Sequence, residues 1–172
     1  MPRVTLHPSL VLGPEDRGPG YSGETIINLM NGGLTTNAKA GWVDVRDVAT
    51  AIVAALDAPS GTHAVICARY VAYRDLAPLL DDLTGRHARR ILLPAGILRA
   101  TARLNDAFGG RLMDLPTAGA LEYVLTSPPI DGSSGTNLLG VNYRPFEETL
   151  TDAIRWWAAN GVIDRRLAGK LG

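Results

Sequence analysis

The sequence predicts a mixed α/β chain with strands in about its first 70 residues and mostly helices after them. Short β-branched or apolar runs at 3–7 and 64–67 are typical of buried strands. Apolar residues recur at helical spacing in several other segments. The chain has 172 residues, 46% of them hydrophobic, which is enough for one unit with a sizeable core.

Composition argues against several functional classes. The 17 basic residues balance the 17 acidic ones, so no net charge favours nucleic acid or an anionic membrane. The single cysteine, Cys67, excludes an internal disulfide framework, and its apolar neighbours indicate a core residue. The first residues do not resemble a signal peptide, and no run of roughly 18 apolar residues occurs. We therefore expect a cytoplasmic protein.

Apolar runs, prolines and glycines divide the first half. The expected elements are a strand at 3–7, a loop over 8–22, a helix capped by Ser22 and ending near Asn31, an extended piece at 42–43, a helix from about 44 to 56, and a strand at 64–67. The helix at 44–56 carries an apolar stripe, which we expect to be buried, formed by Val48, Ile52, Val53 and Leu56.

The second half of the sequence is predicted to be mostly helical. A helix lined by leucines between 76 and 83 contains Pro78, which predicts a late start or a bend. The further expected elements are a strand-like run at 90–93, a helix after Pro94 with Ile97, Leu98, Leu104 and Phe108 buried, a helix from Pro116 through 124, a turn-rich stretch at 126–135, a helix from Pro145 with Phe146, Leu150, Ile154 and Trp157 on one face, and a fraying tail at 165–172.

The stretch GPGYSG at 18–23 has the G-x-G-x-x-G spacing of a dinucleotide-binding turn, and Asp44 follows about 20 residues later. A working turn of this kind comes directly after a strand, whereas here a proline-rich loop intervenes. Pro19 also removes a backbone donor from a loop that has to donate N–H groups. We therefore interpret 18–23 as a surface or lid loop, and Asp44 as a capping residue of the next helix.

The sequence gives little support for a hydrolase active site or for a metal site. Ser133 and Ser134 lack the G-x-S-x-G spacing of a nucleophile elbow and indicate a polar turn. His7, His63 and His87 are scattered, without a partner at metal-ligand spacing. We expect no metal site.

The charged residues Asp44, Arg46 and Asp47 lie within a segment whose other residues are predicted to be buried. Isolated buried charge is costly, so these residues are expected to pair with one another or to reach an interface. A structural ion-pair network at a helix start is favoured, and direct ligand contact is the alternative.

Several segments of the sequence form a pattern when they are taken together: HPSLVLGP at 7–14, VDVRDVA at 43–49, GTHAVIC at 61–67, and NLLG at 137–140 followed by YRPFEETL at 143–150. This set resembles the extended short-chain dehydrogenases/reductases, in the branch of NAD-dependent epimerase/dehydratases that is similar to dihydroflavonol reductase. They occur in the family's order and spacing between about residues 4 and 159. The resemblance implies a partial Rossmann-like parallel sheet, containing late strands only, plus a mostly helical substrate-binding portion. The first part spans about 1–70 and the second about 71–160 of a single unit.

The chain departs from this family in its catalytic motifs. The family's glycine-rich phosphate turn has no counterpart, and no tyrosine stands four residues before a lysine, because the only lysines are Lys39 and Lys170. Without a Tyr-x-x-x-Lys pair, no tyrosine can have its pKa lowered by a lysine one helical turn away. No catalytic residue is therefore assigned, and whether this chain is itself an enzyme stays open.

The resemblance implies the substrate-binding C-terminal portion of an enzyme that uses NAD or NADP to transfer hydride at a carbonyl or hydroxyl carbon. Pro8, Ser9 and Leu10 would line the nicotinamide, and Tyr21, Ser22, Ile26 and Met30 would face a small-molecule substrate. The chain alone is expected to bind no cofactor tightly. It would be a fragment, a mis-started frame or half of a split protein, with its N-terminal half or a second copy as partner. The alternative is a non-catalytic, stand-alone binding or dimerising module.

Overall fold

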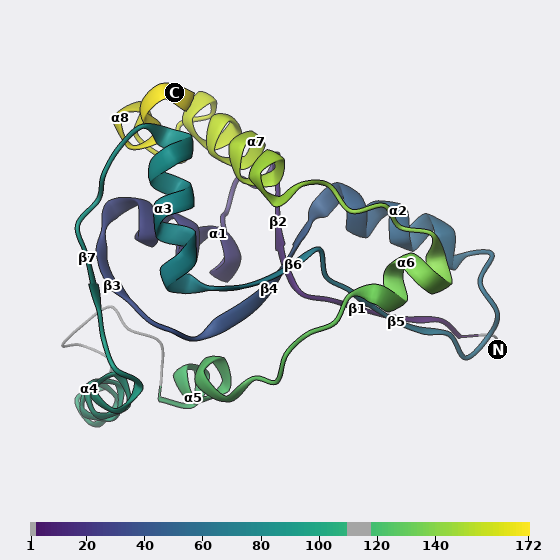
Figure 1. The fold of residues 1–172 in the computed structure, drawn as a ribbon, viewed down its shortest axis with the longest axis horizontal. Coiled ribbons are helices and arrows are strands. Elements are labelled where there is room, and N and C mark those ends of the chain that lie inside the picture. The colour runs from purple at the N-terminus through teal and green to yellow at the C-terminus, as the bar shows by residue number, and fades with distance from the viewer. Residues whose placement is uncertain (1–2, 110–117) are drawn as a thin grey trace.

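The computed structural model describes residues 3–109 and 118–172 and has three small sheets surrounded by helices (Figure 1). The elements are, in chain order, β1 (Thr5–Pro8), β2 (Leu10–Leu12), α1 (Tyr21–Asn31), β3 (Gly33–Thr35), β4 (Lys39–Asp44), α2 (Val45–Ala55), β5 (His63–Ile66), β6 (Arg69–Ala72), α3 (Tyr73–Thr84), β7 (Arg90–Leu92), α4 (Ala95–Ala107), α5 (Ala118–Thr126), α6 (Ser133–Leu139), α7 (Phe146–Ala159), α8 (Arg165–Ala168) and a 3-10 turn at Gly169–Leu171. The α/β class and the early strands are confirmed.

Strands β1 and β5 form a parallel pair, with Leu6 opposite Ala64 and Pro8 opposite Ile66. One face of the pair contributes to a core cluster with Ala51 of α2. The outer edge of β5 is closed by α6, because the Val65 N–H donates to Ser134 Oγ at 2.8 Å. Strand β1 has no second partner strand among the described residues, so its outer edge is open.

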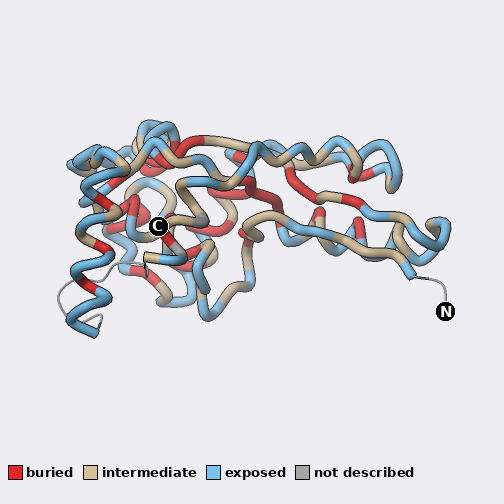
Figure 2. Tube along the Cα trace, turned by 90° about the horizontal axis from the view of Figure 1, so that it is seen from below, coloured by how far each residue is buried: buried red, intermediate tan, exposed pale blue. Residues whose placement is uncertain are grey.

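The central sheet has the order β2-β4-β6, with β2 parallel and β6 antiparallel to β4. The largest core cluster lies here, between this sheet and helices α1, α3 and α7. Trp42 of β4 and Trp157 of α7 are fully buried in it. Figure 2 shows many buried segments gathered inside the broader end of an elongated molecule.

Strands β3 and β7 form a separate parallel pair, and α4 packs on α5 through a small cluster of Leu98, Ala102 and Leu121. In Figure 1 these two helices stand at the edge of the molecule, away from α2 and α6. No helix of the described part of the chain is long and apolar enough to cross a membrane.

Most of the two apolar stripes predicted to be buried is exposed, and the prediction was wrong there, although Val48 packs partly buried against a core cluster. On α2 the exposed fractions are 53% for Ile52, 66% for Val53 and 80% for Leu56, because the helix turns Asp47 and Ala51 inward instead. On α4 only Leu98 of the predicted stripe is buried, while Ile97, Leu104 and Phe108 are exposed. Small residues, Ala51 and Ala102, make the close contacts on both helices.

Several element predictions also need correction. Strand β2 lies inside the predicted loop, and α6 begins within the last three residues of the predicted turn-rich stretch. Gly20 rather than Ser22 is the N-cap residue of α1. The C-terminal tail forms α8, which buries Leu167 and Ala168 and does not fray. Helix α3 starts at Tyr73 and runs through Pro78, so no late start occurs. The predicted start of a helix at Pro116 lies outside the described residues.

The apolar face predicted for the last helix is confirmed. Phe146, Leu150, Ile154 and Trp157 of α7 are all buried in the main core. This helix therefore supplies much of the packing that holds the central sheet.

We predict that Leu150→Ala lowers the free energy of unfolding by about 2–5 kcal/mol, because it leaves a cavity in this core. Leu56→Ala on the exposed α2 stripe is the matched control and is expected to change it by at most about 0.5 kcal/mol. Urea denaturation of the two variants and the parent measures both values. Equal losses for the two would contradict the described packing.

Candidate functional site

Helix α1 carries the four residues predicted to face substrate, and the structure separates them into two groups. Ile26 and Met30 are 0% and 3% exposed and belong to the main core. Tyr21 is 47% exposed and Ser22 is partly buried. Only Tyr21 and Ser22 therefore remain accessible to a ligand.

The G-x-G-x-x-G stretch leads into α1 but does not follow a strand directly, since β2 ends at Leu12. Gly20 is the N-cap residue and provides no side-chain cap. Gly23 is a packing glycine, because an added Cβ would meet the ring of Trp157 at 3.0 Å. The geometry fits a loop that anchors α1 to α7.

The three residues predicted to line a nicotinamide lie where β1 passes into β2. Pro8 is exposed, and Ser9 is bonded to the end of β5, with its N–H and Oγ donating to the Ile66 carbonyl at 3.0 and 3.2 Å. Leu10 pairs with Trp42 of β4 and packs on the main core. Pro8 and Ser9 thus stand at the carboxyl ends of two parallel strands, the edge at which open α/β sheets bind ligands.

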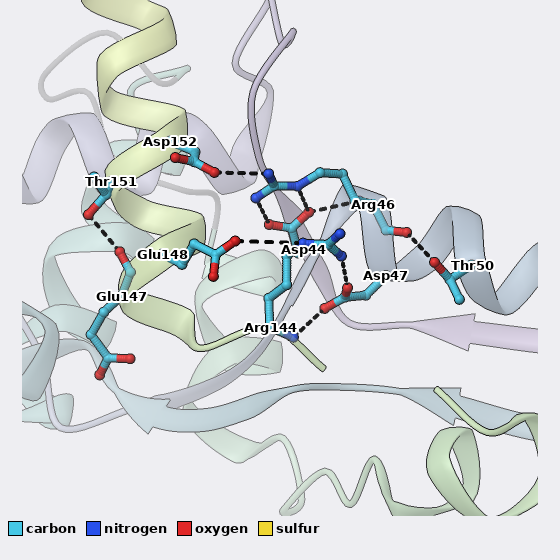
Figure 3. Close-up of polar contacts among 9 residues, drawn as sticks. All are labelled: Asp44, Arg46, Asp47, Thr50, Arg144, Glu147, Glu148, Thr151 and Asp152. Atoms are coloured by element: carbon cyan, nitrogen blue, oxygen red, sulfur yellow. Dashed lines mark hydrogen bonds and ion pairs between the residues drawn. The ribbon is translucent and has the colours of Figure 1, made fainter. Parts of the chain in front are cut away.

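Asp44, at the end of β4, is the centre of an ion-pair network (Figure 3). Its side chain is fully buried and accepts from the Arg46 N–H at 2.8 Å, which confirms that it caps α2. The Arg46 guanidinium donates to both Asp44 oxygens, from Nε at 2.9 Å and Nη2 at 2.7 Å. Its Nη1 also pairs with Asp152 of α7 at 2.9 Å.

Asp47 forms the second half of this network. Its buried carboxylate accepts the Arg144 N–H at 2.9 Å and is also paired with the Arg144 guanidinium. Arg144 lies 3.8 Å from Glu148 on the first turn of α7. Two carboxylates at the start of α2 are therefore linked to α7, Asp47 through Arg144 just before the helix and Asp44 through Arg46 to Asp152 within it (Figure 3).

The pKa of Asp44 reflects this arrangement. Burial alone would raise it, but hydrogen bonds from the side chain and backbone of Arg46 and from Thr149 outweigh burial and hold it below its usual value. Arg46 in turn has its pKa raised by the hydrogen bond to Asp44, against the effect of its own burial. Both groups therefore stay ionised at neutral pH.

A pocket opens at the carboxyl end of β5 and has a volume of about 330 Å³. It is lined by residues 67–70, by 130–133 and by Thr136 and Tyr143. Gly41 lies directly behind it, because an added Cβ there would meet Cys67 Sγ at 2.8 Å and Ser9 Cβ at 3.0 Å. The pocket therefore adjoins the position at which Ser9 ends the neighbouring strand.

Tyr143 and Gly132 hold the wall of this pocket together. The Tyr143 hydroxyl donates to the Gly132 carbonyl at 3.0 Å and accepts the Cys67 N–H at 3.4 Å. Any side chain at Gly132 would overlap the backbone of Cys67. Burial raises the pKa of Tyr143, so its hydroxyl stays protonated as a donor.

The sequence analysis did not identify this pocket. Its walls come from three segments that are far apart in the chain, and the segment 130–133 had been interpreted only as a turn. Tyr143 carried a usable signal, since it begins the segment YRPFEETL on which the family resemblance partly rests. Within 3–109 and 118–172, no group of three or more His, Cys, Asp or Glu could hold a metal ion.

We predict that Arg46→Ala lowers the free energy of unfolding by about 2–4 kcal/mol, because it leaves the buried Asp44 carboxylate without its main donor. The loss is below that of a fully buried pair, since the Arg46 side chain is 33% exposed. Arg74→Ala, which breaks a surface pair with Asp75, is the control, with an expected loss of about 0–1 kcal/mol. Denaturant midpoints measure both, and an unchanged midpoint for Arg46→Ala would refute the structural role.

The lowered pKa of Asp44 also predicts acid sensitivity. The stabilisation is fully present above the pKa of an unfolded aspartate, about 3.9, and is lost as the pH falls below it towards the lower folded value. Asp44→Asn removes this titration, so its unfolding free energy is expected to depend less on pH than that of the parent between about pH 5 and 2. Parallel slopes for the two proteins in urea titrations across this range would contradict the assignment.

No protein-family model matches the chain. A sterol demethylase protein B from Methylococcus capsulatus is 22% identical over 165 residues, which are 92% of this chain and 50% of that protein. A cinnamoyl-CoA reductase from Medicago truncatula is 37% identical over 84 residues, 46% of this chain and 26% of the relative. The chain thus spans half or less of the length of these relatives.

Solved structures match the fold more completely. The protein gox2253 covers 94% of this chain with a TM-score of 0.77 and 22% identity, over 50% of its own length. A nucleoside-diphosphate-sugar epimerase from Pseudomonas aeruginosa covers 95% with a TM-score of 0.72 and 23% identity, again over 50% of its length. A UDP-glucuronic acid 4-epimerase from Bacillus cereus, solved with UDP-glucuronic acid and NAD, covers 93% with a TM-score of 0.63 and 16% identity, over 46% of its length.

The parallel strands and the similar solved structures indicate the same fold as the order of motifs in the sequence. The resemblance to the extended short-chain dehydrogenases/reductases is confirmed in the fold, which is that of about half of an NAD-dependent epimerase/dehydratase-type enzyme.

Proposed function

We propose that this chain is the substrate-binding C-terminal portion of an NAD(P)-dependent oxidoreductase or epimerase-like protein that acts on a carbonyl or hydroxyl group. The observation that carries the proposal is the meeting of the carboxyl ends of β1 and β5 beside the open pocket. In parallel α/β sheets this edge is where ligands bind. The part at about 1–70 supplies these strands, and the part at about 71–160 supplies most of the helical surroundings.

The edges of the β1–β5 pair support a second segment as partner. Ser134 closes the edge of β5, whereas the described residues leave the edge of β1 open. One face of the pair also carries His7 and His63, which are exposed and stacked with ring centres 6.0 Å apart. Parallel sheets are normally covered on both faces and both edges, so a partner that adds a strand beside β1 would complete this one.

Helix α2 presents a matching apolar surface. Val45, Ile52, Val53 and Leu56 are between 39% and 80% exposed on one side of the helix. An exposed stripe of this kind on a helix beside an open sheet edge favours association. The N-terminal half of such an enzyme, carrying the phosphate turn and the Tyr-x-x-x-Lys pair, is the partner we propose.

In this proposal NAD or NADP binds to the complete enzyme. The N-terminal half provides the pyrophosphate site, and Pro8 and Ser9 contribute to the nicotinamide side. Tyr21 and Ser22 stand at the start of α1 as candidate substrate contacts. A stand-alone binding or dimerising module is the second candidate, favoured by the closed edge of β5 and by the well-filled main core.

The proposal predicts that co-expression with the coding segment upstream, or with the N-terminal half of a related enzyme, yields a complex that binds NAD(H) or NADP(H). The 172-residue chain alone is expected to bind either cofactor more weakly than about 10 μM, and to self-associate or be poorly stable. Calorimetric titration and size-exclusion chromatography with light scattering measure these properties. Binding by the chain alone at or below about 10 μM would sink the proposal.

A matched pair of variants tests the docking surface. Ile52→Asp on α2 is expected to abolish the complex, whereas Ile97→Asp on α4 is expected to leave it intact. The two isoleucines are 53% and 50% exposed, so neither change disturbs a buried core. A stable, cooperatively unfolding monomer that forms no complex would instead support the stand-alone module.

A further inference from the structure

The pocket beside β5 contains few side-chain groups that are free to bind a ligand. Ser133 Oγ donates to Asp131 at 2.8 Å, Thr136 Oγ1 donates to the Val141 carbonyl at 2.9 Å, and the Tyr143 hydroxyl donates to the Gly132 carbonyl at 3.0 Å. Each of these hydroxyl protons is already used within the protein. The side-chain groups left for recognition of a ligand are therefore the Tyr70 hydroxyl and the charged residues of the lining.

Arg69 is the charged donor of this pocket. It lies at the first position of β6, its side chain is exposed, and it forms no ion pair with any carboxylate of the described residues. A guanidinium offers a planar fork of donors that matches a carboxylate or a phosphate. Arg69 thus differs from Arg46 and Arg144, whose charges are neutralised by Asp44 and Asp47.

Asp131, the acidic residue of the lining, is engaged in its own turn. Its Oδ1 accepts the Ser133 N–H at 2.9 Å and its Oδ2 accepts the Ser133 hydroxyl at 2.8 Å. Its charge is therefore partly satisfied inside the protein, whereas that of Arg69 is not. This asymmetry favours an anionic ligand over a cationic one.

The remaining lining is suited to a small apolar body. Ile130 contributes an aliphatic side chain and Tyr70 an aromatic ring. A volume of about 330 Å³ lies at the lower end of the range for small-molecule sites and accommodates a body the size of one ring with a short substituent.

We propose that this pocket binds the anionic end of a small amphiphilic ligand, with Arg69 holding a carboxylate or phosphate group and Ile130 and Tyr70 contacting the apolar part. The inference deepens the proposed function, on which it rests in taking this edge of the sheet as ligand-binding. It adds a class of ligand and residues that the family motifs do not assign.

The test titrates the 172-residue chain with three ring compounds of similar size, followed by chemical-shift changes in NMR spectra. Benzoate and phenyl phosphate carry the two anionic groups, and benzyl alcohol is the neutral probe. We expect at least one anion to bind with a dissociation constant below about 5 mM, and benzyl alcohol to bind at least tenfold more weakly. The preferred anion distinguishes a carboxylate from a phosphate ligand.

Variants locate the binding. Arg69→Gln is expected to weaken binding of the anion about tenfold or more, and Arg69→Lys, which keeps the charge but loses the fork, less than Arg69→Gln. Arg74→Gln is the control, since Arg74 is an exposed arginine that does not line the pocket, and it is expected to bind as the parent does. Arg69 is exposed, so both Arg69 variants are expected to retain the parent's unfolding midpoint.

The inference is overturned if neither anion binds the parent, if benzyl alcohol binds equally well, or if Arg69→Gln binds like the parent. These measurements need no cofactor, and where the chain alone self-associates they are made on its complex with the N-terminal half. Failure here with a cofactor-binding complex intact would remove the anion site and leave the proposed function standing. The opposite outcome would leave an anion site on a stand-alone module.

Discussion

The buried carboxylate of Asp44 connects the two halves of this molecule. It ends β4, caps α2 and pairs with Arg46, which reaches Asp152 on α7. The two residues before Asp44 belong to the two larger core clusters, Trp42 to the one around the central sheet and Val43 to the one beneath α2. Because a buried charge is costly when it is alone, the position of each partner is strongly constrained. The side chains that pack around α2 and around α7 must therefore be arranged so that these ion pairs are kept.

The same network determines the shape of the pocket, although none of its acidic residues lines it. Asp47 binds the backbone and side chain of Arg144, and the adjacent Tyr143 donates to Gly132 at the start of α6. Gly132 lies against Cys67 so closely that no side chain fits between them. The ion pair at the start of α2 is therefore connected to the end of β5 through these consecutive contacts. The edge of the sheet proposed to bind a ligand is thus held by residues with a structural role.

The sequence predicted the features that depend on local pattern and failed where tertiary packing decides. The buried face of α7 and the capping by Asp44 follow from spacing and residue type, and both are present. The stripes of α2 and α4 have the same helical spacing, yet the structure buries Ala51 and Ala102 in place of the larger side chains. Periodicity shows that a helix has an apolar side but does not show what covers it. The sequence analysis missed the pocket because its walls come from 67–70 and 130–133, and no local sequence pattern indicates that these two segments lie side by side.

The exposed stripe of α2 and the open edge of β1 are best understood together. A small protein that folds alone is expected to bury Ile52, Val53 and Leu56, because burying three large apolar side chains contributes to the free energy of folding. In this structure all three side chains are exposed. Here α2 approaches the sheet through Ala51 and Asp47, a geometry that the Asp47–Arg144 pair enforces. The cost of exposing the stripe is recovered only if another surface covers it. In the proposed complex, the ion pairs that stabilise the fold would therefore also orient α2 towards the partner.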